Sequence, residues 1–335
     1  MKTLDRRRFL LAASAAVAAC DQVVVDVSGL PDNVELDADG KPFISPISEI
    51  GQFYVYQVGG FPDVEERTWS CVILDRGTEL GRIDKALLET LTPREVELTL
   101  QCIGSTPSIR NINNAVWGGL PLAEVLEAAG VQGPGESIIE LRLAGADDYH
   151  ASLPVEDVEG APVWVIWRMN GQPLPFEHGA PCRLMVPGRY GIKNLKWITE
   201  IEYLDTVHEG FWDPMGWSHT GEYKTNGFIF FPATNTSVLA PVWVVGTAFS
   251  GRDPVARVEL TDDGGETWTE CTITYGAEEN VWALWELLWT PTDPGTYDVQ
   301  VRVTTASGSQ SVMEPGGTDR LQGYDGGMLV KLTVA

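Results

Sequence analysis

The chain has 335 residues, of which 44% are hydrophobic and 21% are charged, a composition typical of a folded protein that is long enough for two domains. Its formal net charge is −24, from 23 basic and 47 acidic residues, which argues against nucleic acid as a partner. The same negative charge does not attract anionic substrates to the protein as a whole. Any anion must therefore be held by local positive groups.

The N-terminal residues 1–20 have the pattern of a targeting segment. Three arginines, Arg6–Arg8, precede an apolar stretch, Phe9–Ala19, that is too short to span a bilayer. The string Arg6–Leu11 is similar to a twin-arginine export signal, and Val17–Cys20 is similar to a lipoprotein cleavage box. The alternative is an ordinary signal peptide with a chance cysteine. We expect an exported, periplasmic or otherwise extracytoplasmic lipoprotein that is anchored to a membrane by acyl chains on Cys20.

The middle of the chain predicts one mixed α+β domain over residues 48–205, after a tether at 21–47 that is rich in Asp, Gly and Pro. Runs of aromatic and β-branched residues predict strands at 52–58, 67–74, 96–101, 137–143, 162–168 and 182–187. Two segments predict helices: residues 84–90 and the amphipathic Leu120–Ala129, which has Pro121 in its first turn.

The C-terminal part, residues 236–335, follows a predicted linker at 206–235 and has a different pattern. Short strands are predicted at 242–247, 256–260, 268–274, 281–289, 297–304 and 328–334. Asp262–Gly265 is a strong hairpin signal. This spacing predicts an all-β sandwich of immunoglobulin-like type.

Four cysteines lie beyond the leader: Cys71, Cys102, Cys182 and Cys271. They form no C-x-x-C pair and no C-x-x-C-H signature, which argues against covalent haem and against a zinc ribbon. Disulfides remain open in an exported chain. Cys102 stands out because it ends a predicted strand and is followed by Gly104, so its thiolate could face a cleft and bind a transition metal. Taken alone, this is weak evidence, and a buried structural cysteine is the favoured interpretation.

A local basic cluster interrupts the acidic sequence between residues 178 and 196. It contains one histidine, two arginines and two lysines among glycines and prolines: His178, Arg183, Arg189, Lys193 and Lys196. Such a cluster can hold a phosphate or another anion. A solvated basic loop is the alternative.

Together these segments resemble the sulfite oxidase family of molybdopterin enzymes. The resemblance rests on Cys-x-Gly at 102–104, Trp-x-Gly at 117–119 and Asn-Gly-x-Pro-Leu-Pro at 170–175, in the family's order. It continues with the motifs His-Gly-x-Pro-x-Arg at 178–183, Pro-Gly-x-x-Gly at 187–191 and Lys-Trp at 196–197. The C-terminal part looks like the family's dimerisation domain, which implies a homodimer.

The resemblance implies roles by position. Cys102 matches the molybdenum ligand, and Tyr149 matches the family's active-site tyrosine, where its phenol could bond an oxo group or a bound oxyanion. The positions expected to hold the pterin and its phosphate are His178, Arg183, Lys193 and Lys196.

Two departures concern the substrate pocket. Sulfite oxidases usually continue Asn-Arg-Arg after Cys-x-Gly, where this chain has Ser105, Thr106 and Pro107. Their first strand typically reads Phe-Val-Arg-Asn-His, and Tyr56 stands at the arginine position here. Arg110 lies nearby without the family's spacing. A buried dianion needs compensating charge, so the sequence leaves sulfite in doubt.

We therefore expect an oxygen-atom-transfer enzyme with a molybdenum–molybdopterin cofactor, no haem, and a separate electron-transfer partner. The substrate stays open between sulfite or a related sulfur oxyanion, a neutral S-oxide or N-oxide, and another organic molecule. An inactive family member that serves as a binding or scaffold module is the alternative from another class.

Overall fold

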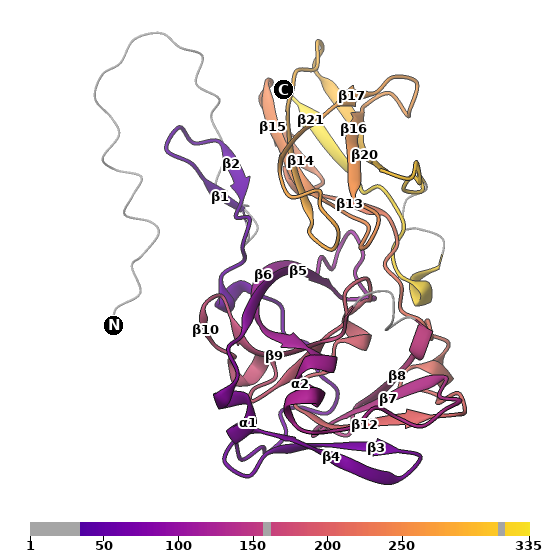
Figure 1. Cartoon of the computed structure of the whole chain (residues 1–335). Coiled ribbons are helices and arrows are strands. Elements are labelled where there is room, and N and C mark those ends of the chain that lie inside the picture. Colours follow the sequence, from indigo (N-terminus) through magenta and orange to yellow (C-terminus); the bar gives the residue numbers. More distant parts are fainter. Residues whose placement is uncertain (1–33, 157–161, 314–318) are drawn as a thin grey trace.

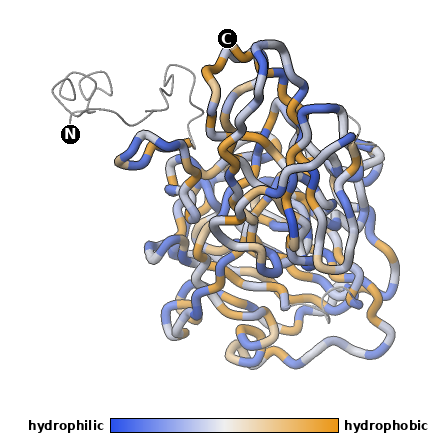
Figure 2. Tube along the Cα trace, turned by 90° about the horizontal axis from the view of Figure 1, so that it is seen from above, coloured by the Kyte–Doolittle hydropathy of each residue, from blue (hydrophilic) through white to orange (hydrophobic). Residues whose placement is uncertain are grey.

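The computed structural model describes residues 34–156, 162–313 and 319–335, so the predicted export signal and Cys20 lie outside the described residues. The chain forms two units, with the N-terminal unit below and the C-terminal unit above in Figure 1. Hydrophilic residues are frequent in the outlying loops, and hydrophobic stretches lie mostly in the interior of the trace (Figure 2). In the described part, no helix has the length and apolar character needed to cross a membrane.

The N-terminal unit contains two five-stranded sheets. The first has the order β10-β9-β6-β5, with β11 also paired to β9. Its strands are β5 (Arg94–Gln101), β6 (Ile112–Pro121), β9 (Trp164–Met169), β10 (Gln172–Pro173) and β11 (Arg183–Met185). All of these pairs are antiparallel, and β5 lies at the edge.

The second sheet has the order β4-β3-β12-β7-β8. Its strands are β3 (Ser70–Asp75), β4 (Thr78–Asp84), β7 (Glu140–Gly145), β8 (His150–Pro154) and β12 (Ile198–Leu204). Strand β12 pairs in parallel with β3 and antiparallel with β7. Ile73, Leu143 and Ile201 are fully buried between the layers of this unit.

The described residues contain only two α-helices, and both are short. Helix α1 (Lys85–Thr90) begins at Asp84, whose side chain accepts a hydrogen bond from the amide of Leu87. Helix α2 (Leu122–Ala128) buries an apolar face against β6 and β9. Single 3-10 turns form η3 (Ile50–Gln52), η4 (Phe176–His178), η5 (Gly191–Lys193), η6 (Asp213–Met215) and η7 (Arg320–Gln322).

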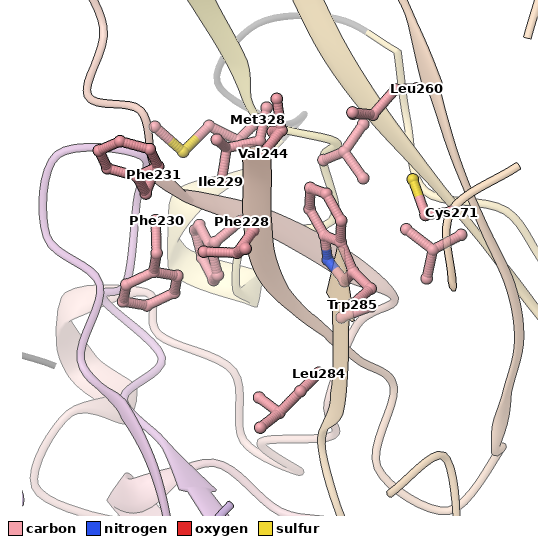
Figure 3. Close-up of a cluster of buried hydrophobic side chains, with 14 of the residues drawn as sticks. Phe228, Ile229, Phe230, Phe231, Val244, Leu260, Cys271, Leu284, Trp285 and Met328 are labelled. Carbon is pink, nitrogen blue, oxygen red and sulfur yellow. The ribbon is translucent and has the colours of Figure 1, made fainter. Parts of the chain in front are cut away.

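The C-terminal unit is built from β-strands in two sheets. One sheet contains β13 (Asn226–Phe231), β15 (Val242–Phe249), β19 (Ala283–Trp289) and β18 (Thr272–Tyr275). The other contains β14 (Thr236–Val238), β21 (Leu329–Val334), β20 (Gly295–Thr305), β16 (Val255–Thr261) and β17 (Thr269–Glu270). Their buried side chains meet in one apolar core, where Phe228, Val244 and Trp285 lie close to Leu260 and Met328 (Figure 3).

The C-terminal unit covers the free edge of β5, which is otherwise unpaired on that side. Three β5 residues make the contacts: Tyr275 Oη donates to the Glu97 carboxylate (2.7 and 2.8 Å), Thr99 N donates to Asn280 O (2.8 Å), and the Gln101 and Asn226 amides exchange hydrogen bonds (3.3 and 3.1 Å). The Thr99 bond satisfies a backbone group that an exposed edge strand would leave open, and the side-chain bonds hold the two units together at this edge.

The structure confirms most predicted strands and both helices, and differs at four places. Residues 53–58 form no strand, because the amide of Tyr54 bonds to the side chain of Asn113 rather than to a neighbouring strand. The tether at 21–47 includes a hairpin of β1 (Val34–Leu36) and β2 (Pro42–Ile44). The segment expected to be a linker contains β13, which pairs with β15. Strand β6 continues to Pro121, where a helix was expected to have begun.

Candidate active site

A cavity of about 280 Å³ opens where β5 ends, and it gathers segments that are far apart in the sequence. It is lined by parts of residues 54–58, 100–111, 147–149, 177–183, 191–196 and 212–217. Five of the six residues expected in the site line it: Cys102, Tyr149, His178, Arg183 and Lys196.

Cys102 follows β5 directly and is partly buried in the pocket wall. Its amide donates to Asn111 O (2.9 Å) and its carbonyl accepts from Ser105 N (3.0 Å), so the loop around the thiol is fixed. Gly104 lies next to the thiol: a side-chain carbon there would be in van der Waals contact with Cys102 Sγ, at 3.9 Å. Burial raises the pKa of the thiol, which is therefore protonated at neutral pH until a metal replaces the proton.

Arg183 on β11 places a buried positive charge in the pocket wall. Its guanidinium donates to the carbonyls of His178 (3.0 Å) and Asn194 (3.2 Å) and lies 4.9 Å from the Trp117 ring. Among the described residues no carboxylate pairs with it, and its Nε is buried without a hydrogen-bond partner. Burial lowers its pKa to about 10, so the group stays charged and is suited to an anionic ligand.

Lys196 lies beside Arg183 because Gly179 separates them without a side chain. A Cβ at Gly179, which has φ +114°, would lie 3.0 Å from the Cβ atoms of both cations. Lys196 Nζ donates to Glu177 O (3.0 Å) and lies 4.2 Å from the Trp197 ring. Burial, together with the charge of Arg183, lowers the pKa of Lys196 to about 7.

His178 and Tyr149 are both uncharged at neutral pH. Burial and the neighbouring Arg183 lower the pKa of His178 to about 4, and its Nε2 donates to Ile50 O (3.3 Å). The neutral ring therefore offers Nδ1 as an acceptor. Burial raises the pKa of Tyr149, whose hydroxyl donates to Ile192 O (2.7 Å).

Lys193 is the one predicted site residue that does not line the pocket. Its side chain is buried, and Nζ donates to Ser152 O (2.8 Å) in the second sheet of the N-terminal unit. The turn η5 directs it to the opposite side from Ile192, which does line the cavity.

The positions that carry arginine in sulfite oxidases line the pocket mouth or lie beside it. Tyr56 lines the mouth and is 58% exposed. Thr106 and Pro107 belong to a tight turn that is closed by two backbone hydrogen bonds between Thr106 and Ile109 (2.9 and 3.0 Å), and they do not line the cavity. Arg110 donates to Ile229 O (2.9 Å), and Arg189 pairs with Glu222 (3.1 Å), so neither guanidinium enters it.

Several further pocket residues were missed in the sequence, among them Tyr54, Asp147, Trp212 and Trp217. The hydroxyl of Tyr54 is buried without a hydrogen-bond partner. Trp212 and Trp217 pack against each other, with ring centroids 6.1 Å apart, in the segment predicted to be a linker. The density of aromatic residues there was the available signal, since a solvated linker rarely needs tryptophan.

Comparisons with known proteins agree with this geometry. Residues 58–212 match the family model described as the oxidoreductase molybdopterin binding domain. The mitochondrial sulfite oxidase of Rattus norvegicus is 29% identical over 60% of this chain and 45% of its own length. The sulfite oxidase of Gallus gallus is 29% identical over 70% of this chain and 61% of its own length. A nitrate reductase [NADH] of Cichorium intybus is 26% identical over 58% of this chain and 26% of its own length.

The fold is similar to that of the sulfane dehydrogenase SoxCD from Paracoccus pantotrophus, with a TM-score of 0.73 and 20% identity over the full length of both chains. The chain spans less than two thirds of the length of each of the three curated relatives above. The residues matched by the family model include Cys102 and most of the segments that line its pocket. Residues 58–212 therefore carry an oxidoreductase molybdopterin binding domain, and the chain is similar in sequence to sulfite oxidases and nitrate reductases.

Proposed function

We propose that this protein is an exported molybdopterin-dependent oxidoreductase that transfers an oxygen atom to or from a small substrate. One observation carries the proposal: the thiol of Cys102 shares a single cavity with two cations, Arg183 and Lys196, in a chain of net charge −24. A thiolate suits a high-valent transition metal, and paired cations suit a phosphate.

The residues present fit the cofactor on structural grounds. Two buried polar atoms in the pocket wall, Arg183 Nε and Tyr54 Oη, have no hydrogen-bond partner among the described residues, which is costly unless a ligand supplies one. Cys102 would ligate the metal, while His178, Arg183 and Lys196 would hold the pterin and its phosphate. When bound, the cofactor supplies the redox chemistry and the exchangeable oxo group.

The chain's own residues bind and orient. Cys102 gives up its thiol proton on ligation, because the bound form is the thiolate. Tyr149 keeps its proton near neutral pH and points it at Ile192 O. To donate a hydrogen bond to a substrate oxygen, the hydroxyl must first give up its hydrogen bond to Ile192 O. Because it keeps its proton, Tyr149 would orient the substrate and not act as a base.

Metal analysis tests the proposal. Properly matured protein is expected to hold about one molybdenum per chain together with a pterin, and Cys102→Ser is expected to abolish activity. A Mo(V) electron paramagnetic resonance signal that changes in this variant would identify the sulfur ligand directly. Zinc, or no metal, in matured protein would overturn the proposal and favour the alternative of an inactive binding or scaffold module.

Reduction of a neutral S-oxide or N-oxide is the second candidate reaction. It is supported by Tyr56 at the pocket mouth and by the direction of Arg110 and Arg189, both of which extend away from the cavity. A dianion that is buried without a charged partner binds less favourably by about 3–5 kcal/mol, which lowers its affinity on the order of a hundredfold or more. Steady-state kinetics on molybdenum-loaded protein should compare sulfite oxidation with sulfoxide and N-oxide reduction under matched redox dyes. Efficient sulfite turnover at micromolar concentration would exclude this preference.

The assembly and location of the protein follow the family resemblance. The two C-terminal sheets are proposed to form an immunoglobulin-like domain that makes a homodimer, and light scattering on purified protein tests this. Electrons are proposed to leave through a separate partner, with no haem in this chain. Anchoring by lipid on Cys20 is tested by mass spectrometry of the membrane fraction.

A further inference from the structure

A second hollow of about 230 Å³ lies next to the cofactor pocket and has a polar wall. We propose that it binds an oxyanion, a carboxylate or a sulfo group, on the guanidinium of Arg110. Tyr54 and Asn111 line both this hollow and the pocket around Cys102, so the two spaces are neighbours. On the proposed function, the anion is one end of a substrate whose neutral reacting end lies in the Cys102 pocket.

The backbone explains why Arg110 points into this hollow. The turn that Thr106 and Ile109 close sends the chain back toward β6, and side chains then alternate in direction. Ile109 therefore lines the Cys102 pocket, while Arg110 lines the second hollow. The turn therefore directs the charge of Arg110 to the second hollow and not to the Cys102 pocket.

The guanidinium of Arg110 has no acidic partner. It donates to Ile229 O (2.9 Å) and lies 4.8 Å from the Phe230 ring, and no carboxylate of the described residues pairs with it. Burial alone lowers its pKa, with no neighbouring acid to raise it. One carbonyl uses only one of the five N–H donors, so the rest can form the paired bonds that oxyanions accept.

The rest of the wall fits a small polar group. Ser108 contributes an exposed hydroxyl at the rim. Asn113 is held by Ser48 and in turn accepts from the amide of Tyr54, which keeps that side rigid. The buried hydroxyl of Tyr54, which has no partner, lies in the wall common to both hollows. A ligand that extends from one hollow to the other would give this hydroxyl an acceptor.

The binding test uses inorganic sulfate and does not depend on turnover. Arg110 also ties the two units together through Ile229, so its removal could harm folding, and the rim offers a cleaner perturbation. Ser108→Glu puts a carboxylate beside Arg110, and Ser108→Gln is the matched neutral control. Isothermal titration of cofactor-loaded protein at constant ionic strength is expected to show sulfate affinity about tenfold or more weaker in Ser108→Glu, and within about twofold of wild type in Ser108→Gln. Equal affinities in both variants, or no sulfate binding in wild type, would overturn the site.

The substrate test uses pairs of sulfoxides that differ only in charge. The series varies the length of the chain between the sulfoxide and a terminal carboxylate. At the length that reaches Arg110, wild type is expected to have a lower KM for the acid than for its methyl ester, with similar kcat. Ser108→Glu should remove that preference and Ser108→Gln should keep it. A preference for the acid that survives in Ser108→Glu would refute the assignment of the anion to the substrate. Protein that binds sulfate as predicted but turns over no sulfoxide would refute the reductase reaction and leave the anion site standing.

Discussion

Lys196 offers the sharpest test of how the pocket holds an anionic cofactor. Its pKa of about 7 means that about nine tenths of the protein carries the charged ammonium at pH 6 and about one tenth at pH 8. A ligand that needs the charged form binds with an apparent Kd divided by that fraction. Affinity for the pterin phosphate should therefore weaken about tenfold from pH 6 to pH 8. Binding is coupled to proton uptake, so affinity is highest below pH 7 and is lost as the pH rises.

The matched pair for this test is Lys196→Met and Lys193→Met. The first removes an ammonium in the pocket, which should cost about 1.5–3 kcal/mol of binding for a charge-assisted contact, and should flatten the pH dependence. The second removes an ammonium that donates to Ser152 O instead, so it should lower thermal stability and leave the pH slope intact. The difference between variant and wild type cancels the titration of the phosphate itself, whose pKa is about 6.

The assay is equilibrium binding of molybdopterin to cofactor-free protein between pH 6 and 8, followed by pterin fluorescence. Molybdenum content after dialysis at each pH gives a second readout. The reasoning is refuted if Lys196→Met retains the slope of wild type, or if Lys193→Met is the variant that loses the cofactor.

Two further predictions rest on the structure and one rests on the sequence. Gly179→Ala should lower the free energy of unfolding by about 1–3 kcal/mol and reduce bound cofactor, because φ of +114° is strained for alanine and the added Cβ would lie 3.0 Å from two pocket side chains. Thermal melts and molybdenum analysis measure these effects, and an unchanged melting temperature would contradict the prediction. Tyr275→Phe removes a donor to the Glu97 carboxylate, so the melting temperature should fall by a few degrees, about 1 kcal/mol, and no change would show that this contact between the units is dispensable. Replacing Arg6 and Arg7 by Lys should leave precursor inside the cell, as seen by fractionation and immunoblotting, whereas unchanged export would indicate a general secretory leader.

The sequence predicted which residues belong to the site better than it predicted where their side chains point. Cys102 and Arg183 could be placed because each belongs to a short motif with fixed spacing on a strand or at its end. Lys193 could not, because its direction depends on a single turn, η5, whose geometry is set by contacts with the distant β8. The aromatic run at 53–56 suggested a strand, but a side chain from β6, Asn113, takes the hydrogen bond that would have made one.

Other differences have the same physical origin. Strand β13 is buried throughout and lies in a segment whose flanks are polar, so its partner β15 could be identified only in three dimensions. The sequence predicted that a helix begins at Leu120, whereas strand β6 continues to Pro121. Proline is common both at the end of a strand and in the first turn of a helix, so it did not separate the two elements. Local patterns fix which elements are present, while long-range pairing fixes their boundaries.

The cover that the C-terminal unit provides for β5 has a consequence for the order of maturation. Glu97, Thr99 and Gln101 all bond to the later part of the chain, and Cys102 is the next residue. In a nascent chain that contains only the first unit, β5 would be paired with β6 alone. The position of the Cys102 thiol at its end would then not be fixed. On the proposed function, Cys102 is the metal ligand, and its position is fixed only after the last sheets have been synthesised and have docked. We therefore propose that the cofactor is inserted late in maturation, after the C-terminal unit has folded onto β5.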